Sequence, residues 1–553
     1  MSDSSSENNS KKGLFVQAGI LAIAGLISRV IGLLYGSPLA AIIGDEGNGY
    51  YGAAYAIYTI ILLLSSYSIP SAMSKIISGK LAVREYRNAH RIFKCALIYV
   101  AIVGGMGSLL LFFGADILVA GRSALVLRFF APTIFLFGFL GVLRGYFQAH
   151  RTMVPTSISQ LLEQIFNAIV SIGGALILTK VAGEADPSKR AVYGAIGSAL
   201  GTGSGVIIAL IFMYFVYSYN RKTIALKLER DTHEDISNGD AFKLIFFIVT
   251  PFILSTFIYN LSTSLNYTLF SRILMHVKNV DESIVAYQYG IFNRKSMVIT
   301  NLPIALASAA ATAMIPEVST ALSRGEKKEA GDIVSRVTRV ILMISIPCGA
   351  GLFALARPVM MILFPQRASL DEAALLLRIL AITVVFYSLS TVTNAVLQGI
   401  GKVNAPVFNA LISLVLQTGV LAVLLIYTDL GDIALCIVTI IYSFLMCLLN
   451  NFVMKRHIPI RNDFKKTYLI PVFASSVMGA GAFGVYGLFD FLIKKIIGGE
   501  YFPNLIATVI AVFVSVFVYF LVLIKSGGAN EDDIRRFPKG SSIVSILKKI
   551  RIL

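Results

Sequence analysis

Long, continuous apolar runs dominate the sequence, and they constrain the fold more than any other feature. Fourteen of them are long enough to cross the hydrocarbon core of a bilayer, which needs about 20 apolar residues in a helix. The runs do not alternate apolar and polar residues, which argues against a transmembrane β-barrel. The predicted spans are residues 14–43, 50–78, 92–113, 124–148, 154–179, 191–218, 242–271, 284–315, 334–356, 372–400, 404–428, 431–454, 468–493 and 503–525.

Composition supports the same fold class. Charged residues make up only 14% of the 553 residues and hydrophobic residues 56%, whereas a soluble domain carries about 25% charged residues. The sequence therefore predicts an all-α polytopic membrane protein with 14 transmembrane helices. The net charge of +18 does not indicate a nucleic-acid partner, because positively charged cytoplasmic loops account for it.

The distribution of basic residues predicts the orientation. If the polar N-terminus (residues 1–12) is cytoplasmic, the cytoplasmic segments hold 33 of the 48 Lys and Arg residues, Arg144 among them, and the outer segments hold 10. The positive-inside rule then places both termini in the cytoplasm. No signal-peptide cleavage pattern follows the first span, so we expect that span to be retained.

Two halves of the chain resemble each other at an offset of about 250 residues. The segment LVLRFFAPT at 125–133 matches LLLRILAIT at 375–383, and REYRNAHRIF at 84–93 resembles GEKKEAGDIV at 325–334. Chance similarity between apolar helices is the alternative, but the polar residues match in register. The repeat predicts two pseudo-symmetric six-helix lobes related by an axis along the membrane normal, plus two extra helices.

This repeat defines the expected domain organisation. The predicted parts are a polar cytoplasmic N-terminus (1–12), an N-lobe of spans 1–6 (13–220), a cytoplasmic linker (221–241), a C-lobe of spans 7–12 (242–454), spans 13–14 (455–525) and a cytoplasmic basic tail (526–553). Within that tail, residues 543–553 (IVSILKKIRIL) have the pattern of a short amphipathic helix on the inner leaflet, with a frayed tail as the alternative.

Charged residues inside predicted spans are candidate substrate-binding residues, because a charge in hydrocarbon is costly. Arg29 lies in the middle of span 1, and Arg294 and Lys295 interrupt span 8. We predict that Arg29 and Arg294 contact substrate, with a structural ion pair or a snorkelling side chain as the alternative. For Lys295 both roles stay open.

Other polar residues in the spans have weaker signals. Glu163 and Gln164 of span 5 are candidates for substrate binding. A structural role is favoured for them, in which they pair with an arginine or cap a helix. Arg128 and Arg378 lie near the starts of spans 4 and 10, where snorkelling to the interface is favoured. The embedded set is therefore mainly cationic, which suits an anionic substrate such as a phosphate ester.

Catalytic and cofactor motifs were not found. The sequence has no Walker A motif, no HExxH or GxSxG motif and no metal-ligand spacing among its four cysteines. We therefore expect no enzyme activity, no cofactor and no bound metal. A proton- or sodium-coupled drug exporter needs embedded carboxylates, of which only Glu163 is evident.

Several stretches resemble a known transporter group. The SRVIG of span 1, the stretch GYFQAHRTMVPTSISQLLEQ across spans 4 and 5, and the NR of span 8 followed by IPEVSTALSRGE are similar to the MurJ/stage V sporulation protein B branch, in its Gram-positive form. This branch belongs to the MOP (multidrug/oligosaccharidyl-lipid/polysaccharide) exporter superfamily. The resemblance covers nearly the whole chain.

The resemblance implies a lipid II flippase of the bacterial plasma membrane, which moves the undecaprenyl-pyrophosphate-linked peptidoglycan precursor from the inner to the outer leaflet by alternating access. It implies that Arg29 and Arg294 are cavity arginines. Two family features differ, because Tyr35-Gly36 replaces an Arg-Asp pair and span 2 lacks an arginine at Leu62–Leu64. Span 7 also lacks the acid of the sodium site that some relatives carry.

Three alternatives to this function remain. The first is a flippase for another lipid-linked polysaccharide, the second a MATE-like cation or drug antiporter, and the third a nontransporting scaffold in cell-wall or spore assembly. The expected partners are lipid II or a related lipid-linked oligosaccharide and membrane lipid, with cell-wall synthesis proteins as further candidates.

Overall fold

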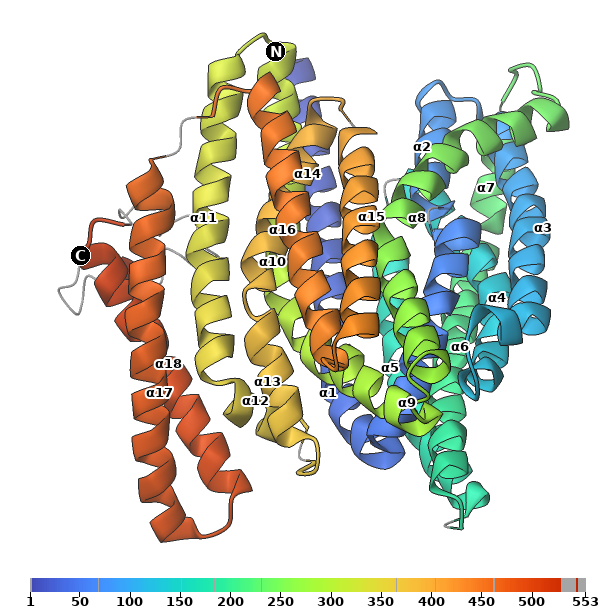
Figure 1. Ribbon diagram of the computed structural model, residues 1–553. Helices are drawn as coiled ribbons and strands as arrows, with labels where there is room; N and C mark the ends of the chain where they lie inside the picture. The colour runs from blue at the N-terminus through green and yellow to red at the C-terminus, as the bar shows by residue number, and fades with distance from the viewer. Residues whose placement is uncertain are drawn as a thin grey trace. The chain divides into compact units, whose positions relative to one another are not determined.

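The computed structural model describes residues 2–528 except 68, 151, 184, 230, 365, 403 and 461–462, together with residues 544–545. Side chains are described at these positions except 2–19, 22, 26, 67, 251–260, 306, 309–317, 319–320 and 323. The described residues form α-helices and three π-helical segments and contain no strand (Figure 1). The predicted amphipathic helix at 543–553 lies outside the described residues, apart from 544–545.

The chain forms two compact units, residues 1–290 and 291–553. Unit 1 contains α1 (Ser2–Leu62), η1 (Leu63–Tyr67), α2 (Ile69–Ala82), α3 (Tyr86–Leu118), α4 (Ser123–Ala149), α5 (Val154–Ala182), α6 (Pro187–Tyr219), α7 (Arg221–Glu229), α8 (Asn238–His276) and α9 (Glu282–Gly290). Unit 2 contains η2 (Ile291–Ser296), α10 (Met297–Ser323), α11 (Lys327–Ala354), α12 (Ala356–Leu363), α13 (Leu370–Leu380), α14 (Thr383–Gly399), α15 (Asn404–Tyr427), α16 (Asp432–His457), η3 (Lys465–Leu469), α17 (Ile470–Ile497) and α18 (Tyr501–Lys525).

Each of the fourteen predicted spans lies mainly on helical residues, and the all-α polytopic fold is confirmed. Among the described residues, 10 helices are long and apolar enough to cross a membrane, or 11 if the bent pair α13–α14 is one span. One of these candidates, Ile23–Ala82, has 60 residues and contains parts of the first two predicted spans. Its 60 residues are enough for two spans of about 20 residues each. Gly44, with φ 71°, breaks its helical backbone between the two predicted spans.

Helices α5 and α6 are held together by glycines spaced four residues apart on α6. A Cβ added at Gly201 would lie 2.0 Å from Ser171 Oγ and 2.6 Å from the backbone nitrogen of Ser171. A Cβ at Gly197 or Gly205 would meet the α5 backbone at 2.4 Å. Small residues at this spacing let two transmembrane helices approach backbone to backbone, where van der Waals contact replaces a hydrophobic driving force.

A second close approach assigns α9 to unit 1. A Cβ at Gly49 of α1 would lie 1.7 Å from the carbonyl oxygen of Ala286, and one at Gly290 would lie 2.1 Å from that of Asp45. These contacts tie α9 to α1, and the boundary between the units falls directly after Gly290. The boundary therefore lies inside the eighth predicted span, whereas the predicted lobe boundary is the linker at 221–241.

In unit 2, the last two helices pack on α11. Tyr519 of α18 donates a hydrogen bond of 2.8 Å to the carbonyl oxygen of Met343 on α11, and Arg339 of α11 donates one of 2.7 Å to that of Gly528. A similar hydrogen bond joins another pair of helices in this unit, since the side-chain amide of Asn409 on α15 donates to Asn450 on α16 at 2.8 Å. Buried hydrogen bonds between helices satisfy polar groups that have no water nearby.

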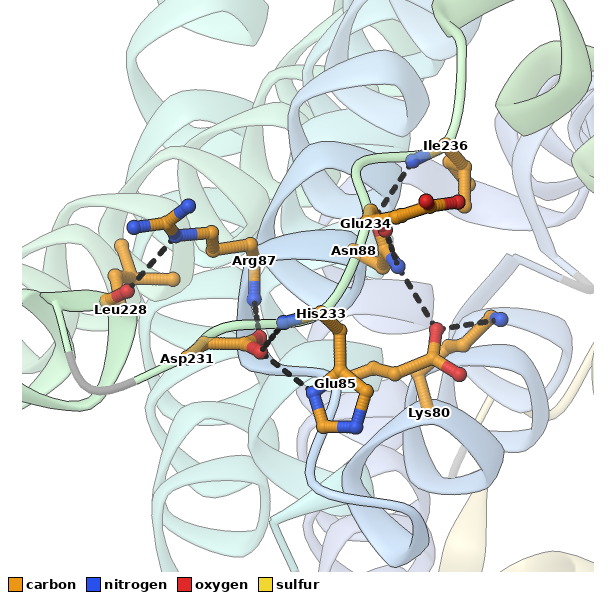
Figure 2. A network of polar contacts seen from close by, with 9 residues as sticks. All are labelled: Lys80, Glu85, Arg87, Asn88, Leu228, Asp231, His233, Glu234 and Ile236. Atoms are coloured by element: carbon orange, nitrogen blue, oxygen red, sulfur yellow. Dashed lines mark hydrogen bonds and ion pairs between the residues drawn. The ribbon is translucent and has the colours of Figure 1, made fainter.

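The linker that follows α7 is anchored to the first turn of α3. Asp231 accepts a hydrogen bond of 2.7 Å from the backbone N–H of Arg87, and it also accepts from the backbone and ring nitrogens of His233, at 3.0 and 2.7 Å (Figure 2). Because the first amides of a helix lack intrahelical partners and carry partial positive charge, a carboxylate is stabilising there. Burial of the carboxylate opposes ionisation, but these hydrogen bonds outweigh it and lower the pKa of Asp231 to about 2.

Asn88 makes a second connection between α3 and the linker. Its amide nitrogen donates to the carbonyl oxygen of Glu234 at 2.9 Å, and its oxygen accepts from the backbone N–H of Ile236 at 2.8 Å (Figure 2). The same amide nitrogen also contacts Glu85, which pairs with Lys80 at 2.7 Å. The hydrogen bonds from Lys80 and Asn88 lower the pKa of Glu85. Side chains from α2 and α3 thus order a linker that has no regular structure of its own.

Substitution of glycine by alanine tests the close approach of α5 and α6. Gly201→Ala should destabilise the protein by about 1–3 kcal/mol, because the new Cβ overlaps the backbone of α5. Gly173→Ala is the control, since a Cβ there meets nothing within 4 Å and alanine is the better helix former. Thermal unfolding in detergent should show a lower midpoint for Gly201→Ala only. Equal midpoints for the two variants would contradict the close approach.

The linker gives a test by hydrogen exchange. Asp231→Asn should reduce the protection of the Arg87 and His233 amides several-fold, because the charged acceptor is lost. Asp186→Asn, which changes a carboxylate at the start of α6, should leave both amides unaffected. In the unsubstituted protein the folded pKa of Asp231, about 2, lies below its ordinary value, so its stabilising contribution is complete above about pH 4 and is lost as the pH falls towards 2. Protection that does not change over this pH range would show that Asp231 does not hold the linker.

Candidate functional site

An ion pair between α4 and α5 contains one of the predicted site residues. The Nη2 atom of Arg144 lies 2.8 Å from Oε2 of Glu163, and Nε of Arg144 donates to Ser159 Oγ at 2.8 Å. Arg144 is only 6% exposed. Glu163 is therefore neutralised by a buried arginine, which is the structural role that the sequence favoured for it.

Arg144 is the embedded residue that the sequence analysis did not single out. The charge distribution counted it with the cytoplasmic segments, because it lies near the end of a predicted span. A signal was present, since Arg144 and Glu163 lie at nearly equal distances in sequence from Met153, where α4 and α5 turn back on each other. In an antiparallel helix pair, residues equidistant from the turn lie side by side.

Arg29 lies on α1 of the same unit and is exposed. Within the described part of the chain it has no hydrogen-bonded or ion-paired partner. Six residues later, Tyr35 accepts a hydrogen bond of 3.2 Å from the side-chain amide of Asn167 on α5. Arg29 therefore has no counter-charge among the described residues, although it lies in the middle of a predicted span, where a charge is costly.

Gln164 follows Glu163 on α5 and is half-buried. The structure describes no hydrogen bond from its side chain to another described residue. The Arg144 pair therefore includes Glu163 but not Gln164, although the two residues are adjacent in sequence.

In unit 2, Lys295 is buried in the π-helical segment η2. It is 1% exposed, its Nζ atom donates to Ser369 Oγ at 2.7 Å, and it lies 5.9 Å from the centre of the Phe364 ring. Direct contact with a substrate would require this hydrogen bond to break. Arg294, its neighbour in the same segment, is half-buried and remains the more accessible cation of the two.

Two of the three π-helical segments each interrupt the second predicted span of a predicted lobe. Segment η1 interrupts the second predicted span, and η2 interrupts the eighth. These spans are the second of each predicted lobe. A π-helical turn inserts an extra residue and redirects the side chains after it, and such turns are frequent at functional sites. No periodic pattern in the sequence indicated either segment.

The embedded charges of the predicted spans differ in their partners. Arg144 and Glu163 offset each other, Arg294 and Lys295 have contacts within the protein, and Arg29 forms no ion pair with another described residue. No cluster of three or more His, Cys, Asp or Glu residues in the described ranges could hold a metal ion.

Comparison with protein families identifies three matching regions. Residues 16–322, more than half of the chain, match a family described as "Polysaccharide biosynthesis protein". A second family with the same description matches residues 369–521, and the MatE family matches residues 296–424. The resemblance inferred from the motifs is thereby confirmed.

Full-length relatives and solved structures agree with these matches. The chain is 24% identical to stage V sporulation protein B of Bacillus subtilis (strain 168), over 94% of this chain and 96% of that protein. It is 24% identical to the lipid II flippase MurJ of the same organism, over 86% of this chain and 89% of that protein.

Among solved structures, lipid II flippase MurJ in an inward closed conformation matches with a TM-score of 0.64 at 14% identity, covering 91% of this chain and 97% of that one. An inward-facing MATE family multidrug resistance transporter matches with a TM-score of 0.61 at 17% identity, covering 77% of this chain and 94% of that one. These likenesses show a shared fold. The chain belongs to the polysaccharide biosynthesis protein family.

Proposed function

We propose that the protein flips lipid II, or a closely related undecaprenyl-pyrophosphate-linked precursor, from the inner to the outer leaflet of the plasma membrane. The observation that carries this proposal is Arg29, an exposed cation in the first predicted span that forms no hydrogen bond or ion pair with another described residue. The embedded Glu163 is at the same time paired with Arg144. Similarity to MurJ and to stage V sporulation protein B over most of the chain supports the class of substrate.

The chemistry of the substrate requires such cations. A pyrophosphate-linked sugar-peptide head group cannot enter hydrocarbon alone, because its polar groups would lose water without replacement. Arginine guanidinium groups bind phosphate oxygens through two parallel hydrogen bonds. Arg29 and Arg294 would each provide such a contact during alternating access, while the polyprenyl tail stays in lipid.

The membrane potential supports outward movement of such a substrate. An inside-negative potential contributes about 2.3 kcal/mol per negative charge per 100 mV to movement of an anion to the outside. The sequence has no Walker A motif for ATP. We therefore propose that transport uses the membrane potential and involves no catalytic step in this protein. Both termini are proposed to be cytoplasmic, on the basis of the basic-residue distribution.

A MATE-like cation antiporter is the second candidate, because the MatE family matches residues 296–424. An antiporter of this kind needs a carboxylate that alternately binds a coupling ion and a cationic drug. Glu163 is the embedded carboxylate that the sequence offered, and in the structure it already has Arg144 as its counter-ion. The ion pair therefore favours the flippase over the antiporter.

Complementation tests the function and the role of Arg29 together. Expression of the protein should restore growth to a bacterial strain depleted of its lipid II flippase. Arg29→Gln should abolish this growth while the protein still reaches the membrane, because the unpaired cation is lost. Arg128→Gln is the matched control, since Arg128 is already paired with Asp116 at the end of its span. Failure of the unsubstituted protein to complement would reject lipid II as substrate, and normal growth with Arg29→Gln would reject the role of that residue.

A double-mutant cycle tests whether the Arg144–Glu163 pair is structural. Arg144→Leu and Glu163→Leu should each destabilise the protein by about 3–5 kcal/mol, because each leaves a buried charge without a partner. The double variant should recover most of this loss and should still flip a fluorescent lipid II analogue in proteoliposomes. If the stable double variant has no transport, the carboxylate has a direct transport role and the antiporter becomes the better hypothesis.

A further inference from the structure

A basic cavity lies on unit 1, away from the embedded charges discussed above. It has a volume of about 450 Å³ and is lined by Arg87, Arg91 and Lys94 of α3, with Asp235 of the linker and Ile98 and Phe242 at its edge. We propose that this cavity binds the phosphate head group of an anionic phospholipid, with the acyl chains lying on the apolar surface of α3 and α8.

The three cations project from one face of α3 because of their spacing. They occur at i, i+4 and i+7, and residues at these intervals lie on the same side of a helix. They also lie in the first three turns of α3, where the partial positive charge of the helix N-terminus adds to their attraction for an anion. Asp235 is the one carboxylate that lines the cavity, so its lining carries a net positive charge.

The linker holds two of the cations in place. Arg91 is ion-paired with Asp235 at 2.6 Å and also donates to the carbonyl oxygen of Ile236. The Nε atom of Arg87 donates to the carbonyl oxygen of Leu228 at 3.1 Å (Figure 2). Ordering of these side chains before a ligand arrives reduces the entropy cost of binding it.

Lys94 is the cation that remains available. It is exposed, and within the described ranges it forms no hydrogen bond or ion pair. A lysine ammonium group is a compact point charge suited to a phosphate oxygen. Lys94 is therefore the residue whose charge a bound head group would neutralise.

The depth of the cavity matches the head-group layer. Residues 98–115 of α3 contain no charged residue, so the hydrocarbon region begins near Ile98. At 1.5 Å per residue, Lys94 lies about 6 Å outside that level, within the interfacial region of a bilayer. The cavity thus opens where the phosphates of lipids reside, on the side that the charge distribution predicts to be cytoplasmic.

The surface below the cavity is apolar and exposed. Ile98 and Ile102 of α3 are 52% and 55% exposed, and Phe246 and Phe247 of α8 are 54% and 71% exposed. Helices α3 and α8 pack against each other. A soluble phosphate would use only the cations, whereas a phospholipid would use the cations and this apolar surface together. Both features favour the lipid, and anionic lipids are enriched on the cytoplasmic leaflet.

Lipid binding to the full chain in nanodiscs tests this proposal. The purified protein is reconstituted in nanodiscs of phosphatidylcholine that contain a small fraction of phosphatidylglycerol. Native mass spectrometry of the protein released from the nanodiscs then counts the phosphatidylglycerol molecules that it retains. Lys94→Gln should weaken retention about fivefold, because one basic residue near an anionic surface contributes about that factor. Lys94→Arg should restore it. Lys222→Gln is the matched control, since Lys222 is an exposed lysine of the nearby α7 that does not line the cavity.

Three outcomes would overturn the proposal. Equal loss of lipid with Lys94→Gln and Lys222→Gln would show diffuse surface attraction. Equal retention of phosphatidylcholine and phosphatidylglycerol would show that the head-group charge is not recognised. The third outcome concerns inorganic phosphate. If millimolar phosphate stabilises the protein against heat as much as phosphatidylglycerol does, and Lys94→Gln removes this stabilisation, the cavity binds a soluble anion instead.

Discussion

The lack of water in the bilayer core is the constraint on which this structure depends. Each backbone polar group in the spans must find its partner within the protein, which restricts the described spans to helices. Side-chain hydroxyls follow the same rule, as when Thr179 and Ser413 donate to carbonyl oxygens one turn earlier in their own helices. Association between helices then depends on close contact, and the glycines of α6 provide it against α5.

The same constraint separates structural charges from functional ones. A buried charge is tolerated when it has a partner, and the removal of one partner is costly. Arg144 and Glu163 satisfy each other, and the buried Lys295 donates a hydrogen bond to Ser369. Arg29 has no such partner among the described residues. In the proposed flippase, such a cation would exchange water for substrate.

On the face of unit 1 that is predicted to be cytoplasmic, charged side chains do not need a buried partner, because they meet water and lipid head groups. The linker after α7 has little regular structure, and its order comes from Asp231 on the first turn of α3 and from Asn88. The same anchoring positions Arg87 and Arg91 at the mouth of the basic cavity. One set of hydrogen bonds thus orders a connection between transmembrane helices and presents cations at the level of the lipid phosphates.

The sequence by itself determined the fold class, because apolar runs of bilayer length can satisfy their backbone only as helices, and all fourteen predicted spans are mainly helical. It also located Arg29, Arg294 and Lys295, since charges stand out in apolar runs. Only the tertiary structure decided which charges are paired, because Arg144 meets Glu163 through the packing of α4 on α5. It also decided where the compact units divide, because contacts between α1 and α9 join segments more than 200 residues apart, and no local pattern encodes such a contact.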